Sequence, residues 1–140
     1  MAKTAREIMT PDPVCVRSSD SVLDAARRMA ELGVGSLPIC GEDNKLKGLI
    51  TDRDIVVKVI AAASDPRAVH VGELAQGEAV RVGADDSAEE MLATMRQHKV
   101  RRLPVIDGQQ LIGIVALADV ARALSDPPVG ALVEALSVDR

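Results

Sequence analysis

The sequence predicts an α/β (α+β) fold in which a β-α-β-β-α unit occurs twice and the two copies pack as a pseudo-twofold pair. The first observation is an internal repeat, because with a shift of 66 residues "PVCVRSSDSVLDAARRMAELGVGSLPIC" falls on "AVRVGADDSAEEMLATMRQHKVRRLPVI". The second is that both copies show the same order of strand and helix patterns. The third is size, since a unit of about 50 residues buries little apolar surface unless it packs against its twin.

In the first copy, "VCV" (14–16) predicts a short strand, and the helix that follows is expected to begin at Ser21. Asp24 lies three residues after Ser21, which is the spacing of a capping box. The helix carries an apolar stripe that predicts one buried face: Val22, Ala25, Ala26 and Met29. "SLPIC" and "LKGLI" predict a hairpin around residues 41–44, and a closing helix is expected from Asp52 to about Ala62.

The second copy repeats these signals. "VRV" (80–82) predicts the first strand, and Ser87 and Glu90 have the capping-box spacing. The helix again has an apolar stripe: Ala88, Met91, Leu92 and Met95. "RLPVI" and "LIGIV" predict a hairpin across residues 107–108, and the closing helix is expected over Leu117–Leu124.

These patterns predict the domain organisation. Residues 8–62 are expected to form the first repeat, residues 63–72 a linker and residues 73–124 the second repeat. Residues 125–140 are expected to form a tail helix with an apolar stripe: Val129, Leu132, Val133 and Leu136. The stripe predicts that this helix closes the core or contacts a second copy of the chain.

The composition excludes several classes of function. The chain has a net charge of −4, no basic block and no aromatic side chains to stack on bases, so we expect no nucleic-acid partner. No apolar run reaches the roughly 20 residues of a membrane span, and the N-terminus lacks a secretory signal, so we expect no membrane partner and a cytoplasmic protein. The two cysteines and two histidines show neither metal-ligand spacing nor a nucleophile beside a base, so we expect no metal site and no enzyme.

The stretch "GLITDRD" (48–54) returns as "GIVALAD" (113–119), which keeps the first Gly and the last Asp. Thr51 and Asp54 have the spacing of a capping box, and this structural role by itself would account for both. The same geometry suits a nucleotide, because a helix N-terminus binds an anion while a carboxylate accepts hydrogen bonds from a ribose. In the second copy Ala116 removes the hydroxyl but Asp119 remains, which we expect capping alone not to explain.

These residues resemble the CBS domain, named for cystathionine β-synthase, which occurs as tandem pairs. The resemblance extends over residues 5–124 and includes "REIMT" and both "LP[IV]" strands. It also includes the G-x-x-[ST]-x-x-D motif, found here at Gly48, Thr51 and Asp54 and, in partial form, at Gly113 and Asp119. The resemblance implies a Bateman module with two clefts between the repeats, a homodimer of pairs, and an adenosine ligand such as AMP, ADP, ATP or S-adenosylmethionine, with no cofactor required.

In this family the motif Asp contacts the ribose hydroxyls, and the segment before the second strand of the other repeat walls the base. The resemblance therefore implies two unequal clefts. The cleft with Thr51 and Asp54 would be walled by residues 100–104, and the cleft with Asp119 by residues 34–38. The candidate wall residues are Val34, Gly35, Ser36, Pro38, Val100, Arg101 and Arg102. The first cleft has the full motif but a crowded wall, and the second has an open wall but lacks the hydroxyl.

Two residue pairs keep alternative interpretations. Arg101 and Arg102 are either solvated at the start of a strand or bind phosphate oxygens bidentately, and we favour phosphate binding in this acidic chain. Cys15 and Cys40 lie on strands expected side by side, so a disulfide is geometrically allowed, whereas a cytoplasmic chain normally keeps its thiols reduced. The resemblance adds weight to a bridge, because a family member has cysteines at both positions.

From these observations we expect a stand-alone CBS-pair regulatory protein. It would bind an adenosine nucleotide of the AMP/ATP type in the interdomain cleft and signal in trans to an unknown protein partner. The alternative is a nucleotide-independent stress-response or scaffold protein with degenerate clefts. Ala116 and the crowding by the arginine wall favour the alternative, whereas Thr51, Asp54, Asp119 and the positive charge of the same arginines favour nucleotide binding.

Overall fold

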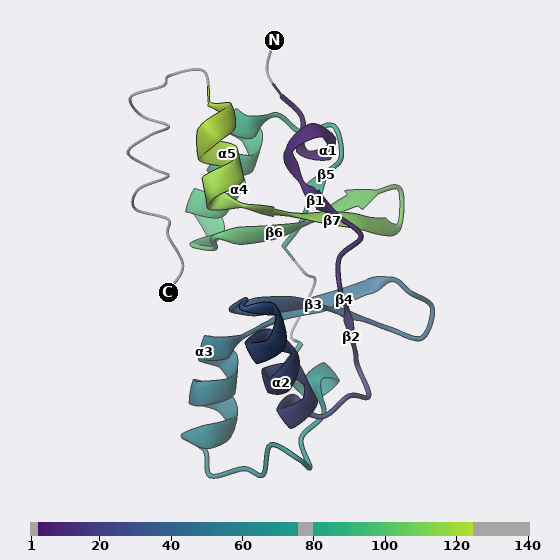
Figure 1. Cartoon of the computed structure of the whole chain (residues 1–140), viewed down its shortest axis with the longest axis vertical. Helices are drawn as coiled ribbons and strands as arrows, with labels where there is room; N and C mark the ends of the chain where they lie inside the picture. The colour runs from purple at the N-terminus through teal and green to yellow at the C-terminus, as the bar shows by residue number, and fades with distance from the viewer. Residues whose placement is uncertain (1–2, 76–79, 125–140) are drawn as a thin grey trace. The chain divides into compact units, whose positions relative to one another are not determined.

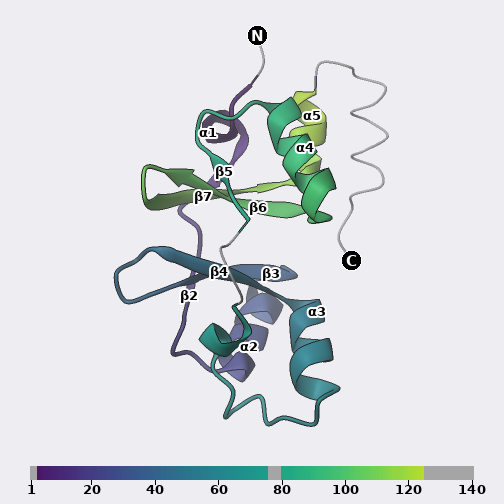
Figure 2. The same ribbon diagram turned by 180° about the vertical axis from the view of Figure 1, so that it is seen from behind.

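The computed structural model describes residues 3–75 and 80–124, which fall into two compact units (Figures 1 and 2). The first-repeat unit comprises Val14–Ala79, and the second-repeat unit comprises Met1–Pro13 together with Val80–Arg140. Each unit has its own sheet and its own buried apolar cluster. The expected tail helix of residues 125–140 lies outside the described residues.

The first-repeat unit is a three-stranded sheet whose strand order is β2-β3-β4, with helices on one face (Figure 1). Its elements in chain order are β2 (Val16–Arg17), α2 (Val22–Leu32), β3 (Ser36–Cys40), β4 (Leu46–Thr51), α3 (Asp52–Asp54), the π-helical η1 (Ile55–Ile60) and the 3₁₀-helical η2 (Val71–Leu74). Strand β2 is parallel to β3, and β3 and β4 form the predicted hairpin. The predicted stripe of α2 is confirmed in that Val22, Ala25 and Met29 are buried.

The second-repeat unit is a four-stranded sheet whose strand order is β1-β7-β6-β5. Its elements in chain order are α1 (Ala5–Ile8), β1 (Thr10–Pro11), β5 (Val82–Gly83), α4 (Ala88–His98), β6 (Arg102–Asp107), β7 (Gln110–Ala116) and α5 (Leu117–Ala123). Strands β6 and β7 form the second predicted hairpin. Ala88, Met91 and Met95 of α4 are buried in the core, as the stripe predicts.

The first strand of each repeat lies further along the chain than expected. The strands cover Val16–Arg17 and Val82–Gly83 in place of residues 14–16 and 80–82. Alternate residues of a strand direct their backbone groups to the same neighbouring strand. Directly after β2 and β5, the N–H groups of Ser18 and Ala84 donate to the carbonyls of Cys40 and Ile106 on the partner strands. Two residues earlier on these partner strands lie Pro38 and Pro104, which have no N–H to donate. The pairing therefore does not extend back along the first strands.

The closing helices also end earlier than expected. The first runs through α3 and η1 to Ile60, and its last turns include the wide hydrogen bond from the Ala61 N–H to the Val56 carbonyl, at 2.8 Å. The second, α5, ends at Ala123. Ala63 follows the first helix in the left-handed region, with φ of 57°, which terminates the helix before the segment that returns to α2.

The segment expected as a linker packs on the start of α2. The N–H groups of Val22 and Leu23 donate to the carbonyls of Val69 and Pro66, each at 2.9 Å. Donors in the first turn of a helix have no partner within the helix. Residues 66–69 supply those partners, so this stretch belongs structurally to the first-repeat unit.

Each unit also contains a short helical segment that the sequence patterns did not reveal. Thr4 and Glu7 form a capping box at α1, and the backbone N–H and hydroxyl of Thr4 donate to Glu7, which holds the pKa of Glu7 below its usual value. Sixty-six residues later the backbone N–H of His70 donates to Glu73 at the start of η2. Thr4 forms an isolated antiparallel β-bridge with Ser87, and His70 forms one with Ser21. The leading segment of each repeat therefore packs with the helix of the other repeat.

The ends of α2 and α4 provide a test of backbone strain. Gly33 and Lys99 occupy equivalent positions in the left-handed region, with φ of 67° and 55°. A Cβ built on Gly33 would meet no atom within 4 Å, so only the backbone conformation opposes a side chain there. We expect Gly33→Ala to destabilise the first-repeat unit by about 1 kcal/mol and Lys99→Gly to stabilise the second-repeat unit by about 0.5–1 kcal/mol. Urea unfolding of both variants measures this, and an unchanged midpoint for Lys99→Gly would contradict it.

Candidate functional site

The complete motif lies where β4 ends and α3 begins. The N–H of Asp54 donates to Oγ1 of Thr51, and the N–H of Thr51 donates to Oδ2 of Asp54, both at 3.0 Å. This reciprocal pair is the predicted capping box. Oδ1 of Asp54 lies 3.4 Å from Nζ of Lys58, and a quarter of the Asp54 side chain is exposed. The carboxylate is thus oriented by the backbone on one side and by a cation on the other.

The partial motif lies where β7 ends and α5 begins, and it reproduces half of this arrangement. The N–H of Ala116 donates to Oδ2 of Asp119 at 3.0 Å, while a guanidinium nitrogen of Arg122 donates to Oδ1 at 3.3 Å. The Asp119 side chain is 25% exposed, the same as that of Asp54. The expectation that capping does not explain Asp119 is therefore wrong, because a carboxylate can cap the Ala116 N–H without any hydroxyl at residue 116.

The predicted wall residues of each repeat lie beside the motif of the same repeat. Ser36 pairs with Thr51 across the hairpin, and the N–H of Asp52 donates to the carbonyl of Gly35 at 2.9 Å. A Cβ on Gly35 would lie 3.2 Å from Oδ2 of Asp52, so a larger residue would crowd this acid. We call the group Gly35, Ser36, Thr51, Asp52 and Asp54 the first motif edge.

The second-repeat unit has the equivalent group. Arg102 pairs with Ala116 across the hairpin, and the N–H of Leu117 donates to the carbonyl of Arg101 at 2.8 Å. The Arg101 side chain is exposed and that of Arg102 is half-buried. We call the group Arg101, Arg102, Ala116 and Asp119 the second motif edge. The two edges share one backbone arrangement but differ in charge, since the first carries two acids and the second two arginines and one acid.

The other predicted wall residues contribute to packing. Val34 and Val100 are partly buried against the apolar clusters of their respective units. Pro38 is buried within β3. Sequence reasoning missed Lys58 and Arg122, although basic residues three or four positions after a helical Asp are a recognisable ion-pair signal.

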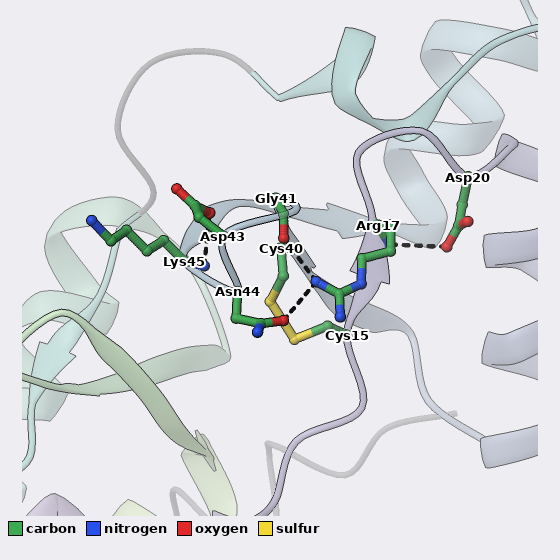
Figure 3. Close-up of a disulfide and its surroundings, with 8 residues drawn as sticks. All are labelled: Cys15, Arg17, Asp20, Cys40, Gly41, Asp43, Asn44 and Lys45. Carbon is green, nitrogen blue, oxygen red and sulfur yellow. Dashed lines mark hydrogen bonds between the residues drawn. A yellow bond between two sulfur atoms is a disulfide. The ribbon is translucent and has the colours of Figure 1, made fainter.

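The structure brings the sulfur atoms of Cys15 and Cys40 to disulfide-bonding distance, with their Cα atoms 5.9 Å apart (Figure 3). Over residues 3–75 and 80–124, no group of three or more His, Cys, Asp and Glu side chains is placed to hold a metal ion. Within the same ranges no helix has the length and apolar character needed to cross a membrane.

Comparison with known proteins identifies the family of both repeats. The CBS domain model matches residues 5–61 and 71–126. The chain belongs to the CBS domain family. Each match begins one residue after Thr4 or His70, so the leading segment of each repeat is part of the family pattern. The match to two CBS domains in tandem confirms the repeated α/β unit expected from the sequence.

Among similar proteins is Hypoxic response protein 1 of Mycobacterium tuberculosis (strain H37Rv), which is 45% identical over 133 residues, covering 95% of this chain and 93% of that protein. The crystal structure of Hypoxic Response Protein I with two coordinated zinc ions matches with a TM-score of 0.82 and 48% identity, over 87% of this chain and 99% of that one. The crystal structure of CBSX2 in complex with AMP matches with a TM-score of 0.73 and 29% identity, over 86% and 94% of the two chains.

Proposed function

We propose that this CBS pair is a cytoplasmic regulatory protein that binds an adenosine nucleotide through its motif edges and acts in trans on a partner protein. The observation that carries the proposal is the shared arrangement of Asp54 and Asp119. Each has one oxygen on a backbone N–H and the other near a cation, with a quarter of the side chain exposed. CBSX2, a relative of the same fold, has been solved in complex with AMP.

The ribose and the phosphate would use different parts of these edges. Vicinal hydroxyls of a ribose can donate to the partly exposed oxygen of Asp54 or Asp119, because a carboxylate accepts several hydrogen bonds. Phosphate oxygens suit the guanidinium groups of Arg101 and Arg102, which donate in a planar fork.

The different charges of the edges favour different ligands. The arginines of the second motif edge favour AMP, ADP or ATP. The first motif edge, with Asp52 and Asp54, better suits S-adenosylmethionine, whose sulfonium is cationic.

The alternative function is a nucleotide-independent stress-response or scaffold protein. It is favoured by Ala116, which lacks the motif hydroxyl. The similarity to a protein named for the hypoxic response is compatible with both functions.

Titration calorimetry with AMP, ADP, ATP and S-adenosylmethionine separates the two functions. We expect Arg102→Ala to weaken binding of AMP, ADP and ATP, and Asp54→Ala to weaken binding of S-adenosylmethionine, each about tenfold or more, since a hydrogen bond to a charged group contributes about 1.5–3 kcal/mol. Asp54→Asn keeps an oxygen for the Thr51 N–H and isolates the effect of charge. Arg27→Ala, an exposed residue of α2, is the matched control and should bind as the wild type does. Flat titrations with all four ligands at millimolar concentration would favour the scaffold function.

We further propose that the protein is a homodimer through an exposed apolar surface of the first-repeat unit. The surface is formed by Val56, Val57 and Ile60 of η1, whose exposed fractions are 58%, 48% and 56%. A twofold interface needs one such surface per chain, because each copy presents it to the other. The equivalent helix of the second-repeat unit has Ala121 buried and Arg122 charged at the positions of Val56 and Val57, so this unit offers no matching surface there.

A further inference from the structure

Cys15 and Cys40 lie next to a fixed positive charge. Cys15 directly precedes β2, and Arg17 of this strand pairs with Cys40 in the register of β2 and β3. The guanidinium is held by the β3–β4 turn, where one nitrogen donates to the Gly41 carbonyl at 2.7 Å and to Oδ1 of Asn44 at 2.8 Å. Figure 3 shows both bonds of the guanidinium to the turn that directly follows Cys40.

The two sulfur-bearing residues differ in access to solvent. Cys40 is 2% exposed, whereas Cys15 is half-buried and follows the exposed Val14. A thiolate from solution can therefore reach the sulfur of Cys15 and not that of Cys40. Exchange requires such an attack on one sulfur and the departure of the other as a thiolate, and a nearby cation stabilises the departing thiolate.

We propose that Cys15 and Cys40 form a redox-active disulfide and that Arg17 is its positioning residue. The thiolate of a small dithiol or dithiol protein attacks Sγ of Cys15, the bond between the two cysteine sulfurs breaks, and its electron pair leaves on Sγ of Cys40 beside Arg17. The second thiol of the reductant then displaces Cys15 as a thiolate. The reductant ends as a disulfide, Cys15 ends as a thiol after taking up one of the two protons that the dithiol releases, and Cys40 ends as a thiolate beside Arg17.

The combination of two cysteines and an arginine is found only in the first repeat. The second repeat has Arg81, Gly83 and Ile106 at the positions of Cys15, Arg17 and Cys40. Cys15 is also the second residue of the first-repeat unit, which begins at Val14. Strand β2 has only two residues, so the bridge is a principal attachment of the chain where it enters this unit. Reduction should therefore loosen residues 14–17 and speed their amide hydrogen exchange.

The test uses the full-length protein equilibrated in mixtures of reduced and oxidised dithiothreitol, then alkylated and analysed by mass spectrometry. We expect Arg17→Gln to shift the equilibrium about tenfold toward the disulfide, equivalent to about 30 mV, and to slow its reduction, because the thiolate of Cys40 loses its cation. Arg17→Lys keeps the charge and should retain most of the wild-type behaviour. Arg27→Gln, on the exposed face of α2, is the charge-matched control.

The direction of the change in the reduction rate of Arg17→Gln separates the proposal from a simple loss of folding. If Arg17→Gln merely loosened the β3–β4 turn, the buried sulfur would become accessible and reduction would be faster. Reduction as fast as in Arg27→Gln, or faster, would overturn the role of Arg17. When the monothiol glutathione replaces dithiothreitol, an adduct found on Cys40 in place of Cys15 would overturn the assigned point of attack. Failure of the thiols to oxidise in the mixtures would overturn the redox pair itself, and none of these outcomes depends on nucleotide binding.

Discussion

Replacing Ala5 by Glu is expected to unfold the second-repeat unit while the first-repeat unit stays folded. Ala5 is fully buried, its N–H donates to the Asp86 carbonyl at 2.9 Å, and the adjacent Arg6 N–H donates to the Ala84 carbonyl at the same distance. A carboxylate at this position has no partner and cannot be hydrated without displacing α1. Burying an unpaired charge costs about 3 kcal/mol or more, which is a large part of the stability of a small domain.

Hydrogen exchange followed by mass spectrometry measures this effect in each unit separately. Peptides from residues 80–124 should lose protection in Ala5→Glu, and peptides from residues 14–75 should keep it. Val71→Glu is the matched variant, because Val71 is fully buried at the equivalent position of η2 and contacts the first-repeat unit. It should show the reverse pattern. Equal loss of protection in both units, or loss in the first-repeat unit of Ala5→Glu, would contradict the assignment of the leading segments.

Charges introduced into the apolar surface of η1 are expected to convert the proposed dimer into a monomer. In a twofold interface Val57→Glu and Ile60→Glu each place two carboxylates, one from each copy, in or near the same contact, and the apolar area of the residue is lost as well. In the double variant that carries both substitutions, we expect the dissociation constant of the dimer to rise at least about 100-fold, equivalent to about 2.7 kcal/mol. Sedimentation velocity over a range of concentrations measures the change.

Val14→Glu is the control for this experiment. Val14 is also an exposed apolar residue of the first-repeat unit, at 38%, but it lies outside the surface formed by η1. It should leave the dissociation constant unchanged. A wild-type protein that remains monomeric at millimolar concentration, or a double variant that associates as strongly as the wild type, would rule out the proposed interface.

The sequence predicts the elements whose signals are local. Ser21 and Ser87 accept hydrogen bonds from the N–H groups of Asp24 and Glu90, as their capping-box spacing indicates. The stripes of α2 and α4 and the two hairpins follow for the same reason, because each depends on residues a few positions apart. The Thr51 and Asp54 box is also present.

Other features depend on residues far apart and could not be predicted in this way. The backbone N–H of Ala5 donates to the carbonyl of Asp86, and a hydrogen bond between residues so far apart in the sequence leaves no local pattern. A signal was nevertheless available, because Thr4 with Glu7 and His70 with Glu73 repeat the same spacing at the same shift of 66 residues. The position of Arg102 opposite Ala116 depends on the register of β6 and β7, which the short turn between them determines.

The most direct test of nucleotide binding by the motif edges is a titration of ¹⁵N-labelled protein with AMP, followed by amide chemical shifts. We expect the largest shifts at residues 35–36 and 51–54 of the first-repeat unit, and at residues 101–102 and 116–119 of the second. Val59 and Val120, fully buried on the closing helices, serve as internal references and should shift little. Saturable shifts confined to either or both edges would support the account, whereas no shifts, or shifts centred on other surfaces, would contradict it.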